Sequence, residues 1–153
     1  MKDKKNYKMD LTDYKHYKQI EIRYDDLDTF NHINNKAYFS YLEEARIDLY
    51  NQLFNIKGQL KITAIVAHIE IDYHKPAFYG QTIGVYTKIS KIGTKSFELS
   101  SVFIVKKEHD KSDEWIASAK VILVSIDPTS GNSVQISDDE RLIMNRYLNA
   151  KES

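Results

Sequence analysis

The chain has 153 residues, enough for one domain that buries roughly 70% of the surface exposed by its unfolded chain. Hydrophobic residues make up 42% and charged residues 29%, and lysine plus arginine equal aspartate plus glutamate at 22 each, which argues against a disordered chain and against a basic protein that binds nucleic acid. No cysteine is present, so disulfides, thiolate zinc sites and a cysteine nucleophile are excluded.

The N-terminal part of the sequence predicts an arm ahead of a single domain. Residues 1–16 are rich in lysine and follow no clear period, which is typical of a loosely held segment. Residues 17–150 are expected to form the domain. The longest apolar run, residues 62–67, is too short to span a bilayer, and no apolar stretch follows the basic N-terminus. We therefore expect a cytoplasmic protein with no membrane partner.

A strand, a polar loop and one long helix follow in that order. In residues 17–24 apolar and polar side chains alternate, with Ile20 and Ile22 on one face, as in a half-buried strand. Residues 25–34 are polar and favour turns and a helix start. Residues 35–54 contain no glycine or proline, and their apolar side chains recur at helical spacing over so much of the circumference that a sheet is expected to wrap the helix.

The rest of the domain is predicted to be mostly strand. The segments rich in β-branched and aromatic residues are residues 62–73, 82–92, 95–105 and 115–126. Because their connections are short, an antiparallel meander is the simplest topology. Residues 137–149 are expected to form a closing helix, with Ser137 as its N-cap and Glu140 completing a capping box. The order predicts an α+β domain in which a five-stranded antiparallel sheet curls around one long central helix.

The polar loop before the long helix is the best candidate for a chemical site. A helix start presents unpaired backbone N–H groups and the positive end of the helix dipole, which suit an anion or a developing oxyanion. Asn34 or Asn35 would cap the helix and present those donors. Asp28 beside them could attack an acyl carbon as a nucleophile or activate water as a general base, and the sequence favours neither route. Asp25 and Asp26 are interpreted as turn formers.

A longer signature surrounds this loop. Its elements are Arg23-Tyr24, Asp28, Asn31-His32-Ile33-Asn34-Asn35, Tyr38, Tyr41 and Glu43-Glu44-Ala45-Arg46. This string resembles the signature of the 4-hydroxybenzoyl-CoA thioesterase-like hot-dog family, and weaker similarity extends it to about residues 20–127. The resemblance implies the hot-dog fold, in which a sheet wraps a central helix, and it implies an enzyme that hydrolyses acyl-CoA thioesters.

The resemblance also implies a role for several residues of the loop and the helix. Asp28 matches the catalytic aspartate, His32 matches a histidine that orients the substrate or assists proton transfer, and the backbone N–H of Asn35 falls where the family polarises the thioester carbonyl. The family has glycine where this chain has Asn31, and asparagine is the next residue to tolerate a positive φ there, although it narrows the cleft. The residues expected to border the substrate are Asn31, Asn34, Tyr38 and Glu44.

More distant residues come from the predicted strand 62–73 and from a predicted hairpin. The polar residues that share one face of that strand are His68, Glu70, Asp72 and His74. Such residues on one flat strand rarely converge on one ion, so no metal site is expected. In the family this strand lies at the dimer interface, which implies that His68 or Glu70 serves the partner's active site. Lys91 and Lys95 flank the hairpin, where the resemblance places loops that meet the CoA phosphates.

Three functional hypotheses follow from the sequence. The leading one is an acyl-CoA thioesterase of fatty acid metabolism that works as a homodimer or homotetramer, with active sites between subunits and no metal or organic cofactor. The second is an acyl-carrier-protein thioesterase, because plant members of that group carry a similar string and the sequence does not specify the leaving group. The third is a non-catalytic hot-dog protein that binds acyl ligands, since the fold alone does not guarantee chemistry. The presence of both Asp28 and His32 favours the enzymes.

Overall fold

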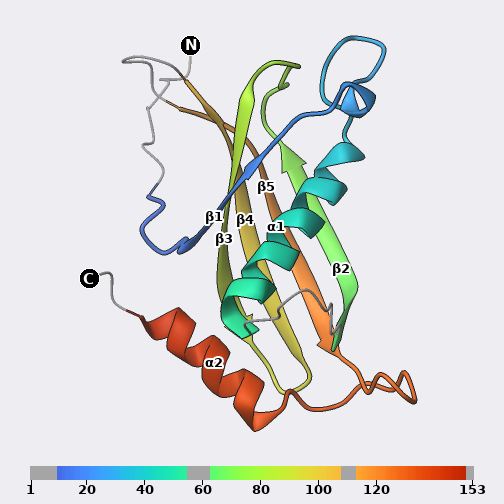
Figure 1. Cartoon of the computed structure of the whole chain (residues 1–153), viewed down its shortest axis with the longest axis vertical. Coiled ribbons are helices and arrows are strands. Elements are labelled where there is room, and N and C mark those ends of the chain that lie inside the picture. Colours follow the sequence, from blue (N-terminus) through green and yellow to red (C-terminus); the bar gives the residue numbers. More distant parts are fainter. Residues whose placement is uncertain (1–9, 55–62, 108–112, 151–153) are drawn as a thin grey trace, which may run out of the picture.

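The computed structural model describes residues 10–54, 63–107 and 113–150 (Figure 1). The elements in chain order are the strand β1 (His16–Ile20), the 3-10 turn η1 (Tyr24–Asp26), the helix α1 (Ala37–Phe54), the strands β2 (Ala64–Tyr73), β3 (Thr82–Ile92), β4 (Ser96–Lys106) and β5 (Glu114–Ser125), and the helix α2 (Asp138–Asn149). Neither described helix has the length and apolar character that a membrane crossing requires. The predicted α+β order of strand, central helix, strands and closing helix is confirmed.

The five strands form one antiparallel sheet in the order β1-β3-β4-β5-β2. The meander prediction is right for β3 to β5 but wrong for β2, which pairs with β5 at the far edge of the sheet and not with β3. The reason is the connection 74–81, which is longer than an ordinary hairpin loop and can cross the end of the sheet. On its way it pairs with the loop before α1, where the N–H of Ile33 donates to the carbonyl of Ala77 at 2.8 Å.

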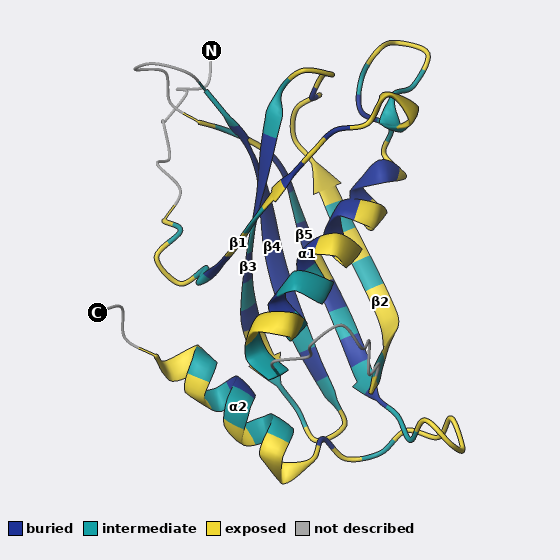
Figure 2. Cartoon of the chain, in the orientation of Figure 1, coloured by how far each residue is buried: buried dark blue, intermediate teal, exposed yellow. Residues whose placement is uncertain are grey.

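The core fills the space between α1 and one face of the sheet (Figure 2). Alternate residues of β3 and β4 point toward α1, and Ile83, Val85 and Phe103 are completely buried there. From the helix side Ala45 and Leu49 are each 1% exposed. The apolar face of α1 is therefore covered by the sheet, as its residue pattern predicts.

The first strand is shorter than predicted. β1 ends at Ile20 and not at residue 24, because the carboxylate of Asp26 accepts a hydrogen bond from the N–H of Arg23 at 2.9 Å and folds the chain into η1. At its other end β1 begins at His16, which the sequence assigns to the arm. The part of the arm at residues 1–9 lies outside the described residues.

The closing helix begins as predicted, but only half of its capping box forms. The hydroxyl of Ser137 accepts a hydrogen bond from the N–H of Glu140 at 3.2 Å, which confirms Ser137 as the N-cap. The prediction for the Glu140 side chain is wrong, because its carboxylate accepts a hydrogen bond from the hydroxyl of Thr63 at 3.1 Å. Glu140 thus connects α2 to the residue just before β2.

Candidate active site

A tight loop at residues 27–33 precedes α1. The N–H of Asp28 donates to the carbonyl of His32 at 2.8 Å and closes the loop. Asn31 adopts a left-handed conformation with φ 60°, and it is the only non-glycine residue of the described ranges with a positive φ. This is the conformation for which asparagine is the best substitute for glycine. The backbone path expected at this position is therefore kept without the family's glycine.

The carboxylate of Asp28 is half-buried and bonded to its own loop through one oxygen. Its Oδ1 accepts hydrogen bonds from the N–H of Phe30 at 2.8 Å and from the N–H of His32 at 3.0 Å. Its Oδ2 has no hydrogen-bond partner within the described part of the chain. The bonds to Oδ1 are those of a turn-forming aspartate. They also hold the carboxylate in place through one oxygen only.

The imidazole of His32 packs against aromatic rings from two segments. Its centroid lies 5.0 Å from the ring of Phe78, which is nearly perpendicular to it, and 6.4 Å from the ring of Phe30. The backbones of His32 and Phe78 also pair in an isolated bridge. Because the connection 74–81 supplies Phe78, this connection helps to fix the histidine. The half-buried imidazole is thereby held in place beside the loop that carries Asp28.

Asn34 forms the turn that leads into α1, and the amide of Asn35 in this turn is left open. The side-chain oxygen of Asn34 accepts a hydrogen bond from the N–H of Lys36 at 3.1 Å, and its carbonyl accepts one from the N–H of Ala37 at 2.9 Å. The carbonyl of Asn35 accepts a hydrogen bond from the hydroxyl of Tyr73 at 3.0 Å. No acceptor for the N–H of the exposed Asn35 is found among the described residues. An open amide at a helix start suits an oxyanion.

Tyrosine hydroxyls around the helix start remain protonated near neutral pH. Burial, and to a smaller extent the neighbouring Tyr73, raises the pKa of Tyr38 to about 12. Burial also raises the pKa of Tyr41 well above its usual value, and the carboxylate of Asp26, which accepts a hydrogen bond from the Tyr41 hydroxyl at 2.9 Å, adds to this effect. The pKa of Tyr73 is raised by burial as well. Tyr38, predicted to border the substrate, is 2% exposed and packs against Tyr73 and Phe103.

Not all residues predicted for the site come together within one chain. The residues that the loop and the helix start bring together are Asp28, Asn31, His32, Asn34 and Asn35. Glu44 is exposed on α1. His68 and Glu70 are exposed on β2, opposite the residues of that strand that pack on the core. Lys91 and Lys95 lie at the hairpin between β3 and β4, at the other end of the sheet from the loop (Figure 1).

Within the described ranges, no three histidine, aspartate or glutamate side chains form a metal-binding group.

Exposed aromatic residues surround the loop and were not predicted as part of the site. Tyr24 and Phe30 are each 77% exposed, and Phe78 and Tyr79 in the connection 74–81 are 42% and 59% exposed. Large exposed apolar side chains that gather in one place commonly mark a binding surface. Their occurrence in segments otherwise rich in turn-forming residues is the sequence signal that points to them.

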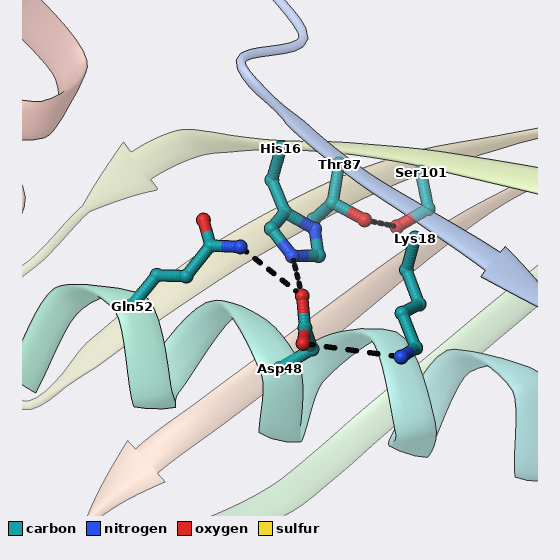
Figure 3. Close-up of polar contacts among 6 residues, drawn as sticks. All are labelled: His16, Lys18, Asp48, Gln52, Thr87 and Ser101. Atoms are coloured by element: carbon teal, nitrogen blue, oxygen red, sulfur yellow. Dashed lines mark hydrogen bonds and ion pairs between the residues drawn. The ribbon is translucent and has the colours of Figure 1, made fainter. Parts of the chain in front are cut away.

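A second aspartate and histidine meet in the interior of the protein (Figure 3). The Nε2 of His16 on β1 lies 2.7 Å from the Oδ2 of Asp48 on α1. The side chain of His16 is 0% exposed, whereas that of Asp48 is 33% exposed. Beside them the hydroxyls of Thr87 and Ser101 are 2.8 Å apart. This pair is absent from the sequence-based site, although a charged residue on the apolar side of the predicted helix is a signal for a buried partner.

Comparisons with known proteins bear on the family and the fold of the chain. A family model described as the thioesterase-like superfamily matches residues 22–144. The chain is 30% identical to the long-chain acyl-CoA thioesterase FadM of Escherichia coli K12, over 80% of this chain and 92% of that protein. Among solved structures it is similar to a thioesterase complexed with coenzyme A and Zn from Thermus thermophilus, with a TM-score of 0.76, 21% identity and coverage of 89% of this chain and 96% of that chain. It is also similar to a mutant of 4-hydroxybenzoyl CoA thioesterase complexed with 4-hydroxybenzoyl CoA, with a TM-score of 0.73, 13% identity and coverage of 84% and 96%. These structural similarities confirm the hot-dog fold expected for this chain.

Proposed function

The chain belongs to the thioesterase-like superfamily, and we propose on this basis that it hydrolyses acyl-CoA thioesters to a free acid and CoA. One observation carries the proposal. On the loop before α1, an oxygen of the Asp28 carboxylate has no partner among the described residues, and the same is true of the N–H of Asn35 at the helix start. The similarity to a long-chain acyl-CoA thioesterase supports acyl-CoA as the substrate class.

In the proposed reaction the start of α1 holds the thioester carbonyl. The N–H of Asn35, aided by the positive end of the helix dipole, donates to the carbonyl oxygen as negative charge develops on it. A donor of this kind contributes on the order of 10²- to 10³-fold to the rate. The acyl carbon then becomes more electrophilic and is presented to the carboxylate of Asp28.

Asp28 supplies the second part of the chemistry by one of two routes. As a nucleophile its Oδ2 attacks the acyl carbon, the C–S bond breaks, CoA leaves as a thiolate, and water hydrolyses the resulting mixed anhydride. As a general base it takes a proton from water, whose oxygen attacks the acyl carbon before the same C–S bond breaks, a role worth roughly 10²- to 10⁴-fold. In both routes His32 orients the substrate or assists proton transfer to the leaving group.

We also propose that the enzyme works as a homodimer through β2. In the described sheet β2 pairs with β5 along one edge only, and the exposed side chains of Ile65, Val66 and Tyr73 lie along it. An open strand edge with apolar side chains favours pairing with another strand. Pairing with the same strand of a second copy would place His68 and Glu70 beside the partner's site. Sedimentation of the native protein tests this, and a monomer at micromolar concentration would contradict it.

The test of the proposed function is thiol release from a panel of thioesters. The panel contains acyl-CoAs of different chain length, 4-hydroxybenzoyl-CoA and acyl-carrier-protein conjugates, and it compares the native protein with Asp28→Asn. We expect turnover of acyl-CoA that falls by roughly 10²- to 10⁴-fold in Asp28→Asn. Asp25→Asn is the matched control, because Asp25 is an exposed aspartate of the same segment, and its rate should equal that of the native protein.

Three other outcomes would overturn parts of the proposal. Turnover of carrier-protein conjugates alone would show that the leaving group is the acyl-carrier protein and not CoA. Equal rates for the native protein and Asp28→Asn would remove Asp28 from the chemistry. No turnover of any thioester would favour the non-catalytic binder of acyl ligands.

A further inference from the structure

Asp26 makes hydrogen bonds that join three parts of the candidate site. Its Oδ2 accepts from the N–H of Arg23 and from the hydroxyl of Tyr41, each at 2.9 Å. Its backbone carbonyl accepts from the N–H of Asn34 at 2.7 Å. One residue therefore connects the segment entering the loop, the segment leaving the loop and the body of α1.

Because Asp26 lies at the base of the loop that carries Asp28, its hydrogen bonds help to place the Asp28 carboxylate. The loop that holds Asp28 begins just after Asp26 and ends just before Asn34, so the bond between Asp26 and Asn34 closes the loop at its base. Asn34 also holds the turn before α1, because its side-chain oxygen accepts from the N–H of Lys36. Any shift of Asp26 relative to α1 therefore moves the carboxylate of Asp28 relative to the amides at the helix start.

Tyr41 is a suitable anchor because it is rigid and remains a donor. It is 3% exposed in the core under α1, and its raised pKa keeps the hydroxyl protonated across the ordinary pH range. A hydrogen bond from a buried hydroxyl to a carboxylate is stronger than one between neutral groups. Its loss would leave a buried polar group without a partner, which costs more than the bond itself contributes.

We propose that Asp26 and Tyr41 are positioning residues, which set the distance between the Asp28 carboxylate and the amides at the start of α1. This inference rests on the proposed thioesterase function and assigns Asp26 a role beyond turn formation. Neither residue touches the substrate in this proposal. The contact between the two residues affects the rate through geometry, since a displacement of about 1 Å between reacting groups can lower the rate on the order of 10²-fold.

The kinetic test uses Tyr41→Phe, Asp26→Ala and Asp26→Asn. We expect kcat for acyl-CoA to fall by about 10- to 100-fold in Tyr41→Phe and Asp26→Ala, with a much smaller change in KM. Asp26→Asn should retain most of the activity, because its amide oxygen can accept both hydrogen bonds. The double variant Tyr41→Phe with Asp26→Ala should be no slower than the slower single variant, since both act through one contact.

Tyr50→Phe is the matched control on the same helix. The hydroxyl of Tyr50 is also buried, but it has no hydrogen-bond partner in the described part of the chain. Its removal should leave kcat unchanged. If Tyr50→Phe and Tyr41→Phe lose the same activity, the effect belongs to helix packing and the positioning role is overturned.

Amide hydrogen exchange gives a readout that does not depend on turnover. The N–H of Asn34 should exchange faster in Tyr41→Phe and Asp26→Ala than in the native protein, and at the native rate in Tyr50→Phe. Native kcat together with native exchange in Tyr41→Phe would overturn the inference. A native protein that cleaves no thioester would overturn the proposed function instead, and faster exchange of Asn34 would still support the positioning contact.

Discussion

Two regions of this protein bring an aspartate and a histidine together, and they do so in opposite ways. In the interior, Asp48 and His16 are in direct contact at 2.7 Å, and the histidine is fully buried. In the loop before α1, Asp28 contacts His32 through the backbone N–H at 3.0 Å, and both side chains are half-buried. In the interior pair His16 is enclosed by the core, and the carboxylate of Asp48 accepts a further hydrogen bond from Gln52 at 3.2 Å. The loop pair instead leaves an oxygen of Asp28 without a partner among the described residues, beside exposed aromatic rings.

This difference suggests that the interior pair contributes to the stability of the fold and the loop pair to the reaction. A bonded pair of this kind lowers the free energy of the folded state only as long as both partners remain, and the side chain of His16 is fully buried. Polar groups without protein partners in an exposed loop contribute little to stability, but they can bind a reacting molecule. We therefore expect changes in the interior pair to alter the free energy of unfolding and changes in the loop pair to alter turnover.

The largest effect on stability is expected for His16→Ala. The substitution removes a buried side chain and leaves the Asp48 carboxylate without its histidine, so the free energy of unfolding should fall by about 3 kcal/mol. Urea unfolding measures this change, while kcat of the folded protein should stay at the native value. A loss of turnover in the folded variant would show that the interior pair takes part in the reaction.

The opposite behaviour is expected for His32→Ala. Loss of the imidazole should lower kcat for acyl-CoA by about 10²-fold, the lower end of the range for a group that assists proton transfer. Because the ring is half-buried and packs on exposed aromatic residues, the free energy of unfolding should change by less than about 1 kcal/mol. Steady-state kinetics and urea unfolding on the same preparation decide this, and a variant that unfolds easily but turns over normally would contradict the comparison.

An intermediate effect is expected at Asn31, whose φ of 60° sets the backbone path of the loop. Asn31→Val places a β-branched residue in the left-handed region and should cost about 2 kcal/mol of unfolding free energy. Asn31→Gly is the control, since glycine adopts this conformation without strain, and its stability should be close to native. Equal stability of the two variants would mean that the loop relaxes to another conformation.

The smallest effect is expected for the hydroxyl pair beside His16. Thr87→Val or Ser101→Ala alone should each lower the free energy of unfolding by about 1 kcal/mol, because the remaining hydroxyl loses its partner in the core. The double variant should be no less stable than either single variant, since no buried hydroxyl is then left unpaired. Additive losses, measured by urea unfolding of all four proteins, would indicate that each hydroxyl has another partner.

The sequence predicted the positions of the helices and strands better than it predicted which strands pair in the sheet. The bounds predicted for β3 coincide with those of the structure, because alternating β-branched residues between clear turn signals define a strand locally. The place of β2 beside β5 depends on where the connection 74–81 finds its hydrogen bonds, and no local pattern contains that information. Strand pairing across the whole chain was therefore the weakest part of the prediction.

The candidate site shows the same division. The positive φ of Asn31 and the turn that Asn34 forms before α1 are both typical of asparagine, and the sequence indicated a left-handed residue and a helix start in this loop. The contact between Asp26 and Tyr41 depends on how the turn η1 lies against α1, so the sequence suggested only a turn former at Asp26. The roles of Lys91 and Lys95 stay predictions, because the hairpin between β3 and β4 that carries both lies at the other end of the sheet from the loop (Figure 1).

The most direct test of the central claim compares Asp28→Asn with Asp48→Asn in one experiment. Both substitutions replace a carboxylate by an amide of nearly the same shape, and both proteins are assayed for acyl-CoA hydrolysis and for urea unfolding. We predict that Asp28→Asn loses turnover by roughly 10²- to 10⁴-fold at native stability, whereas Asp48→Asn keeps native turnover and loses about 1 kcal/mol or more of unfolding free energy. A folded Asp48→Asn without activity beside a fully active Asp28→Asn would contradict the assignment of the chemistry to the loop.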